Sequence, residues 1–418
     1  MVEILEDVVI VGGGIAGLAT AVALQRLGIR SLVLERSHEL RTTGTSITLS
    51  PNAWRALDAL GVAHKLSPLY DSISKSYVTD VATGKTGVVH LTEPGSDSGA
   101  KLVHRSRLLE SLAEELPQNT IRFNAKLASF NTETTIDGSS AAILNLEDGT
   151  IIKAKAVIGC DGVHSVVAEW LGLSAPVESG RSAVRGLTIY PEGHGVKEVQ
   201  QFLGDGARAG FAPLTATELY WFITYTGTDS SRDPELIKKL VIENKGKGFP
   251  KSYIDAVERS EPDSLTLDKL KFRSPWNLVL RPAHRGNVTV AGDAMHPMTP
   301  DLGQGGCMAL EDAVVLGRNM GKLRRADGSV EWGRIGEALG VYAKERRWRV
   351  AGVVAGAYFS GRAQQGETGW MTWFSWVTKF FRDYLFYGLV FNRFLVRVRD
   401  YDCGRLTEPA TSAAPKLD

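Results

Sequence analysis

A glycine-rich segment near the N-terminus has the residue types that bind a diphosphate. In VVIVGGGIAGLATAVALQRLGIRSLVLER, Gly12, Gly14 and Gly17 have GxGxxG spacing between an apolar run and a helical pattern. In such a turn the first glycine allows a sharp bend, the second leaves room for a pyrophosphate, and the third lets helix and strand pack closely. Ile15 and Ala16 begin the helix, whose unpaired amides would face the phosphate oxygens. The segment therefore predicts a dinucleotide site.

The acid at the end of the next apolar run supports this interpretation. Glu35 lies where an acid accepts hydrogen bonds from the adenosine ribose hydroxyls, and Arg36 follows it. This arrangement favours an adenosine without a 2′-phosphate. A GxGxxG turn alone can be no more than a turn, but the strand, the helix and the acid together indicate a site for FAD or NAD. These residues do not distinguish the two.

A second segment, residues 156–173, reads AVIGCDGVHSVVAEWLGL. An apolar strand brings Asp161 and Gly162 into a turn, and Ser165 is a candidate cap for the helix that follows. By itself this segment is better explained as a strand that ends in an Asp-Gly turn. Its interpretation as part of a site depends on the third segment. No other GxGxxG lies between a strand and a helix, so a separate NAD(P)H-binding domain is not expected.

The third segment, VTVAGDAMHPMTPDLGQGG at residues 288–306, combines an acid, a stiff loop and bare backbone. Asp293 can accept hydrogen bonds from sugar hydroxyls, the prolines stiffen the loop, and Gly303 to Gly306 can approach a flat ring closely. A helix expected to begin near Cys307 would point its positive end at that ring. It would stabilise a ring that becomes anionic on reduction, as a flavin does. His296 is a candidate base, but within DAMHP it is better explained as a residue that organises the loop.

The elements that must position these residues follow a β-α-β order. Residues 7–11 are an apolar run, 18–27 a helical pattern and 31–35 a second apolar run, which predicts a parallel nucleotide-binding sheet. Residues 184–226 contain short alternating segments rich in Tyr, Trp, Phe and Val, which predict an inserted antiparallel sheet. Helical patterns dominate from about residue 303.

Composition excludes several classes of protein. The chain has 418 residues, 43% hydrophobic and 23% charged, and a net charge of +1, which is typical of a globular protein and argues against nucleic acid as a partner. Cys160, Cys307 and Cys403 form no CxxC pair, so we expect no disulfide, no metal site and a reducing compartment. Because the chain enters a strand almost at once, we expect no targeting segment and a cytoplasmic location, or a plastid location after removal of a transit peptide.

In this order, GGGIAG, CDGVHS and GDAMHPMTPDLGQGG resemble the motifs of class A flavoprotein monooxygenases, the single-component hydroxylases with the para-hydroxybenzoate hydroxylase fold. The resemblance extends from about residue 8 to about residue 349. With the C-terminal YDCGRL, it is greatest for plant monooxygenases related to zeaxanthin epoxidase and for bacterial salicylate-type hydroxylases. It implies bound FAD, NAD(P)H as co-substrate, and reaction of the reduced flavin with O2 to a C4a-hydroperoxyflavin. One oxygen atom would then enter a small aromatic or otherwise electron-rich substrate, with water excluded.

The fold implied is α/β: a Rossmann-like FAD-binding domain with an inserted antiparallel β-sheet substrate domain and a C-terminal helical segment. We assign residues 1–72, 101–180 and 276–330 to the FAD-binding domain, 73–100 and 181–275 to the substrate domain, 331–405 to C-terminal helices, and 406–418 to a tail expected to be disordered. The sequence leaves the oligomeric state open.

The resemblance also assigns roles to residues. Arg41 and Arg105 would lie near the cofactor, Asp161 belongs to a motif used for FAD and nicotinamide alike, and Asp293 would bind the ribityl chain. The whole cofactor set is Gly12, Gly14, Ile15, Ala16, Gly17, Glu35, Arg36, Arg41, Arg105, Asp161, Gly292, Asp293, Gly303, Gly305 and Gly306. Pro300 would lie against the ring face where oxygen reacts. The residues expected around the reacting ring are Pro300, Gly303, Gln304 and Gly305.

One departure and two alternatives bear on this assignment. The family usually writes DGxxSxVR, but Ala168 and Glu169 stand at its end here, so Asp161 lacks a usual partner and the nicotinamide contacts are less supported than FAD. A flavin-dependent halogenase would need a WxWxIP element, which YWFITY does not provide. A non-catalytic FAD-fold escort protein would lack the complete GDxxH and GQG loop. Hydroxylation, epoxidation and Baeyer–Villiger insertion remain open, as does the choice of NADH or NADPH.

The substrate is expected between the inserted sheet and the flavin. The candidate lining residues are Phe202, Phe211, Pro213, Tyr220, Phe222, Tyr225 and Arg185. Alternation puts Tyr220 and Phe222 on one face and Trp221 and Tyr225 on the other, but the face that looks toward the flavin is not determined. For any single one of these aromatic residues, a place in the core is the better explanation. Arg185 is either a cation for an acidic substrate or a solvated strand residue.

The aromatic-rich stretch at residues 370–394 is interrupted by charged residues and is too short in apolar runs to span a membrane. We expect a helix pair that covers the substrate domain. The alternative is a helix in peripheral contact with a membrane, because Lys and Arg beside Trp and Phe suit an interface.

Overall fold

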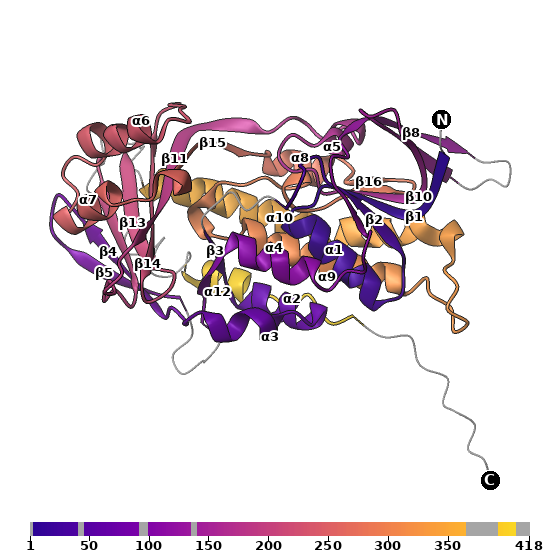
Figure 1. The fold of residues 1–418 in the computed structure, drawn as a ribbon, viewed down its shortest axis with the longest axis horizontal. Helices are drawn as coiled ribbons and strands as arrows, with labels where there is room; N and C mark the ends of the chain where they lie inside the picture. The colour runs from indigo at the N-terminus through magenta and orange to yellow at the C-terminus, as the bar shows by residue number, and fades with distance from the viewer. Residues whose placement is uncertain (1–2, 41–45, 92–98, 135–139, 365–391, 407–418) are drawn as a thin grey trace, which may run out of the picture.

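The structure is a computed structural model, and it describes residues 3–40, 46–91, 99–134, 140–364 and 392–406. Two sheets lie toward opposite ends of the molecule, with helices packed between and around them (Figure 1). The expected mixed α/β fold is confirmed, with a second sheet whose neighbouring strands are antiparallel except for one parallel pair. The expectations for residues 370–394 fall largely, and those for the tail almost wholly, outside the described residues. Among the described helices, none is long and apolar enough to cross a membrane.

The first sheet contains the nucleotide-binding strands in the order β16-β17-β10-β1-β2-β7. Their bounds are β1 (Glu3–Val11), β2 (Ser31–Leu34), β7 (Ile121–Arg122), β10 (Ile151–Gly159), β16 (His284–Arg285) and β17 (Val288–Val290). The pairs that β1 makes with β2 and β10, and that β10 makes with β17, are parallel. The antiparallel pair β8 (Leu127–Thr134) and β9 (Ser140–Leu146) extends this sheet from β10.

Strand β1 is apolar at consecutive positions because both of its faces are covered. Val8, Val9 and Ile10 are fully buried. Helix α1 (Ile15–Arg26) packs against α9 (Gly305–Gly321), and both lie beside this sheet. Because β17, β10 and β1 are parallel neighbours, the three motif segments that follow them emerge side by side at one edge.

The second sheet has seven strands in the order β15-β11-β14-β13-β12-β4-β5. Their bounds are β4 (Lys75–Asp80), β5 (Thr86–His90), β11 (Val177–Ile189), β12 (Val199–Gly204), β13 (Ala207–Pro213), β14 (Glu218–Thr226) and β15 (Thr266–Phe272). One face of this sheet packs against α6 (Pro234–Lys239) and α7 (Lys251–Glu258), where Trp221 and Tyr253 form the centre of a second hydrophobic core. The other face therefore looks toward the first sheet.

The remaining elements join the two sheets. The strands β3 (Ser46–Leu49) and β6 (Lys101–His104) pair with each other, and around them lie α2 (Pro51–Leu60), α3 (Ala63–Leu66) and α4 (Arg105–Ala113). Helix α5 (Val166–Trp170) follows the second motif, and α8 (Pro275–Leu280) precedes the third. The long helix α10 (Ile335–Gln364) packs against α8, α9 and the turn Pro300–Leu302, and α12 (Asn392–Arg399) packs against α2.

Candidate active site

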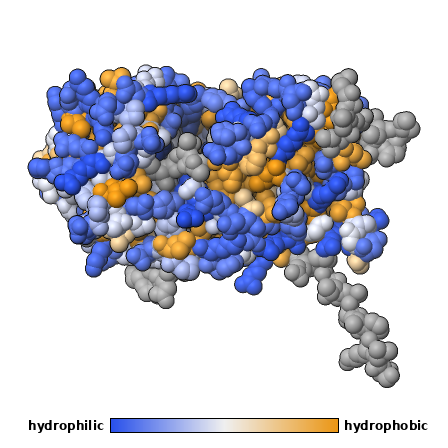
Figure 2. All heavy atoms as spheres, in the orientation of Figure 1, coloured by the Kyte–Doolittle hydropathy of each residue, from blue (hydrophilic) through white to orange (hydrophobic). Residues whose placement is uncertain are grey.

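A cavity of about 530 Å³ lies where the three motif segments meet, and residues of the second sheet border it as well. In Figure 2 a hollow with a partly apolar wall opens in the middle of the face shown, between the two ends of the molecule. The cavity is bordered by all three motifs, by β3, and by Arg185 and Tyr220 of the second sheet. One space therefore joins the predicted cofactor loops to the predicted substrate sheet.

The glycines of the first motif have the three properties expected of them. Gly12 has φ +109°, and a Cβ there would collide with the Cys160 carbonyl. A Cβ on Gly17 would collide with the carbonyl of Gly12, so α1 and β1 can approach only because this residue has no side chain. At Gly14 no neighbouring protein atom lies within 4 Å of the place that a Cβ would occupy. This open space beside the first amides of α1 fits a diphosphate.

The Glu35 carboxylate binds the backbone of the glycine turn. Its carboxylate accepts hydrogen bonds from the backbone N–H of Gly13 at 2.8 Å and of Ser37 at 2.9 Å, and the residue is only 1% exposed. Its neighbour Arg36 borders the cavity directly. Glu35 thus shapes the glycine turn, and its assignment to the ribose remains a prediction.

The two carboxylate oxygens of Asp161 have different surroundings. Its Oδ2 accepts from the N–H of Val166 at 2.8 Å, and Ser165 caps α5 as expected by accepting from Ala168 N–H at 2.8 Å. Asp161 Oδ1 is buried and has no hydrogen-bond partner among the described residues, and burial raises the pKa of this carboxyl. Backbone amides at the start of α5, rather than a basic side chain at position 168, hold this carboxylate. The free oxygen beside the cavity fits a hydroxyl of a bound cofactor.

The loop after β17 brings an acid and bare backbone to the same cavity. Gly292 has φ +59° and leaves no room for a Cβ beside Ala16. The Asp293 side chain borders the cavity. Removal from bulk solvent raises the pKa of its carboxyl, while the charges of His296 and Arg105 lower it. Gly303 adopts the left-handed conformation with φ +62°, and a Cβ on Gly306 would collide with Ile47.

Helix α9 begins at Gly305, two residues before the expected start at Cys307. The difference arises because Gly303 ends the turn Pro300–Leu302 and Gln304 already caps the helix, so no loop residues remain before Gly305. The first amides of α9 lie at the cavity, which Gln304, Gly305 and Gly306 border. A helix N-terminus carries partial positive charge and favours a ring that becomes anionic.

His296 is buried away from the cavity and organises the loop. Its Nε2 lies 2.6 Å from Asp312 Oδ2, which also accepts from the N–H of Gly292 at 2.8 Å. Burial raises the pKa of Asp312, but the charges of His296 and Arg346 outweigh burial and lower it to about 2. The interpretation of His296 as a structural residue of the loop is supported by these contacts.

The structure brings some of the predicted substrate residues to the cavity and keeps others away. Tyr220 and Arg185 border it, whereas Phe222 lies on the same face with its ring centre 6.2 Å from that of Tyr220 but does not border the cavity. Burial raises the pKa of Tyr220, while nearby Arg185 lowers it. The Tyr220 phenol is therefore protonated at neutral pH.

Phe202, Phe211, Pro213 and Tyr225 do not border this cavity, because they lie on the other face of the second sheet. Phe211 pairs directly with Trp221 across the strands, so both point to the face covered by α7, and Phe202 contacts Tyr253 on that face. Pro213 pairs with Leu219 and shares this face. Tyr225 is buried there too, with 1% exposure. The reason is the period of two along each strand, which sends these side chains away from the first sheet.

Of the two arginines expected near the cofactor, Arg105 borders the cavity, and Arg41 lies outside the described residues. Sequence reasoning missed several other bordering residues. They are Ser46, Ile47, Thr48, Leu102, Val163, His164, Met298 and Thr299. Aliphatic and hydroxyl residues have no sequence pattern that marks them as site residues. Met298 and Thr299, however, lie within the third motif segment, residues 288–306.

Comparisons with known proteins place this geometry among characterised folds. The chain matches the family described as FAD binding domain over residues 6–357. Monooxygenase 2 of Arabidopsis thaliana is 42% identical over 412 residues, which cover 96% of this chain and 98% of that protein. Monooxygenase 1 of the same plant is 37% identical over 409 residues, which cover 96% and 99%.

A similar fold is found in Klebsiella pneumoniae HpxO, solved in complex with FAD and uric acid. The TM-score is 0.78 at 23% sequence identity, and the match covers 95% of this chain and 96% of that one. At this identity the likeness concerns the fold. Two open features of the present cavity, the space at Gly14 and the unpartnered Oδ1 of Asp161, fit the diphosphate and hydroxyl groups of such a cofactor.

Proposed function

The chain belongs to the family of FAD-dependent monooxygenases that share this FAD-binding domain, and we propose that its substrate binds in the part of the cavity between Pro300 and the second sheet. The enzyme uses NAD(P)H and O2. The observation that carries the proposal is that Tyr220 and Arg185 border the same cavity as Asp293 and Pro300.

Different segments of the chain would bind different parts of FAD. Gly14 and the first turn of α1 would hold the diphosphate of FAD, and Asp161 and Asp293 would accept hydrogen bonds from its hydroxyls. Bound FAD supplies the electron transfer and the activation of O2 that no side chain can provide. The N-terminus of α9 would stabilise negative charge at the edge of the ring, because its unpaired amides point there.

The second sheet supplies groups suited to a small aromatic or otherwise electron-rich substrate. The protonated Tyr220 hydroxyl can donate a hydrogen bond to a substrate oxygen, and the Arg185 guanidinium can attract an acidic or phenolic group. Arg185 is also paired with Asp268 at 2.9 Å, which fixes the position of the guanidinium. Pro300 and Met298 also border the cavity, and their apolar surface would help to exclude water from the substrate.

A direct test combines spectroscopy with turnover. The purified protein should show a flavin spectrum, and NADPH oxidation in air should rise in the presence of some members of a panel of phenols, aromatic acids and N-heterocycles. A Tyr220→Phe variant should lose substrate stimulation while keeping its flavin. The matched control is Tyr225→Phe on the same strand but on the opposite, buried face. Equal effects of the two substitutions would refute the substrate site.

For the location we propose a reducing compartment such as the cytoplasm. The support is that Cys160, Cys307 and Cys403 are all buried and unpaired. Fluorescence microscopy of the chain fused at its C-terminus to a fluorescent protein tests this, and accumulation in the secretory pathway would contradict it.

A further inference from the structure

The loop after β17, residues 292–304, is called the flavin loop below, and buried hydrogen bonds hold it at both ends. Gln304, at the end of the loop, donates from Nε2 to Ser50 Oγ at 3.1 Å and accepts on Oε1 from Asn52 Nδ2 at 3.0 Å. Gly292, at the start of the loop, donates its backbone N–H to Asp312 Oδ2 at 2.8 Å. Gln304 and Asp312 are fully buried, so these contacts are shielded from water.

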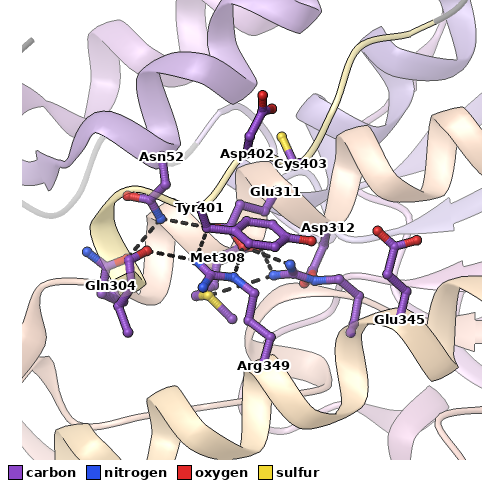
Figure 3. Close-up of polar contacts among 12 residues, drawn as sticks. Asn52, Gln304, Met308, Glu311, Asp312, Glu345, Arg349, Tyr401, Asp402 and Cys403 are labelled. Atoms are coloured by element: carbon purple, nitrogen blue, oxygen red, sulfur yellow. Dashed lines mark hydrogen bonds and ion pairs between the residues drawn. The ribbon is translucent and has the colours of Figure 1, made fainter. Parts of the chain in front are cut away.

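Asn52 connects the loop to a buried acid. Its Nδ2 also donates to Glu311 Oε1 at 2.6 Å, so one amide group bridges Gln304 and Glu311 (Figure 3). Glu311 and its neighbour Asp312 lie on α9, and both are fully buried. Two adjacent buried carboxylates are tolerated only when cations pair with them.

Two arginines of α10 supply those cations. Arg349 binds Glu311 through two nitrogens, at 2.7 Å and 2.5 Å, which is the bidentate geometry of a strong arginine-carboxylate pair. Arg346 lies 2.7 Å from Glu311 Oε2 and donates to Asp312 Oδ1 at 2.6 Å. Arg346 therefore contacts both acids: Asp312, which binds the start of the loop, and Glu311, which is linked to its end through Asn52.

The C-terminal segment covers these arginines. The ring centre of Tyr401 lies 3.8 Å from the Arg349 guanidinium carbon and 5.7 Å from that of Arg346. Arg349 also donates to the carbonyl of Val398 at 2.9 Å, and Asp400 pairs with Arg55 on α2. Figure 3 shows Tyr401 lying over this cluster, with Cys403 following it. An aromatic ring over a guanidinium attracts the cation and keeps water from it.

We propose that the segment around Tyr401 is a positioning element of the flavin site. Tyr401 acts through Arg346 and Arg349, which hold Glu311 and Asp312, and these acids hold the two ends of the loop. The segment itself lies outside the cavity. Its loss would loosen the loop and the first turn of α9, and so change both the affinity for FAD and the electrostatic environment of the bound ring.

The test compares Tyr401→Leu with Tyr401→Phe. Phenylalanine keeps the ring over the arginines and should behave as the native protein, whereas leucine should raise the Kd for FAD by about 2- to 30-fold. The midpoint potential of the bound flavin should become more negative, because a displaced helix N-terminus stabilises the reduced anion less. The Kd is measured by fluorescence titration of the protein freed of flavin, and the potential by dye equilibration.

Trp332→Leu is the matched control, because it removes an aromatic ring 5.0 Å from the Lys155 ammonium, a contact outside this cluster. If Tyr401→Leu lowers the melting temperature but changes Kd and potential no more than Trp332→Leu does, Tyr401 is only a stabilising residue and the proposal fails. Should Tyr401→Leu not fold, Arg349→Lys replaces it, because lysine keeps the charge and loses the bidentate pair. An unchanged Kd and potential in Arg349→Lys would likewise overturn the proposal.

Discussion

The ion pair between Arg181 and Asp301 allows a quantitative prediction. Arg181 on β11 binds both oxygens of Asp301 at 2.9 Å, and the two side chains are 1% and 0% exposed. Arg208 lies 3.6 Å from the same carboxylate. Asp301 follows Pro300 directly, so this pair joins the second sheet to the flavin loop. Substitution of Asp301 by Asn would leave a buried guanidinium without its counter-ion.

We expect Asp301→Asn to lower the free energy of unfolding by about 3–5 kcal/mol, the range for removing one partner of a buried pair. Strand β11 offers a matched control in the pair Arg185 and Asp268, which has the same 2.9 Å distance but side chains 26% and 61% exposed. Asp268→Asn should cost less than about 1 kcal/mol. The comparison therefore sets a buried pair with two hydrogen bonds against a partly exposed pair with one, at the same N–O distance.

Urea unfolding followed by circular dichroism and tryptophan fluorescence measures both losses, and coincident transitions would justify a two-state treatment. The double variant Arg181→Met with Asp301→Leu removes both charges and should recover most of the lost stability. Losses below about 1 kcal/mol for both single variants would refute the argument from burial. A double variant as unstable as Asp301→Asn would show that shape, rather than charge, is what the site requires.

Three further results are expected. Gly14→Val should weaken FAD binding strongly with little change in the melting temperature of the flavin-free protein, because its side chain meets only open space; an unchanged Kd by fluorescence titration contradicts the diphosphate site. Asp293→Ala should purify with little flavin, judged by the ratio of flavin to protein absorbance; full occupancy removes its role. Because the pKa of Asp312 is lowered from 3.8 to about 2, its stabilisation is complete above pH 3.8 and is lost as the pH falls toward 2; acid unfolding of Asp312→Asn should be shallower in that window, and parallel curves would disprove this.

The loops of the site were predictable because their requirements are local. A left-handed φ at Gly303 and a collision-free approach at Gly12 and Gly17 depend on the backbone within a few residues, and glycine is the residue type that provides both. The parallel sheet was predictable from continuous apolar runs such as Val8 to Val11. Sequence patterns of this kind determine which segment forms the site and how its backbone runs.

The contacts between distant segments were not predictable. Phe211 and Tyr220 lie on strands joined by a short turn, and alternation alone could not say which of them faces the first sheet. Glu311 sits in a helix that is apolar on most sides, and only the folded chain shows that Arg349 and Asn52 meet it. Charged residues in a sequence are usually solvated, so a buried cluster has no distinctive pattern.

The chain leaves and re-enters the nucleotide-binding region at paired strands. The longer excursion, which builds most of the second sheet, starts after Gly159 of β10 and returns at β16 and β17, and β17 pairs with β10. The shorter one, which supplies β4 and β5, runs between β3 and β6, whose ends Leu49 and Lys101 also pair. The shorter segment thus has its ends fixed about one strand spacing, ~4.8 Å, apart. The longer one leaves and rejoins the first sheet within three consecutive strands, β16-β17-β10. Because strand pairing holds the ends of these insertions, their length can change without displacing the nucleotide-binding strands.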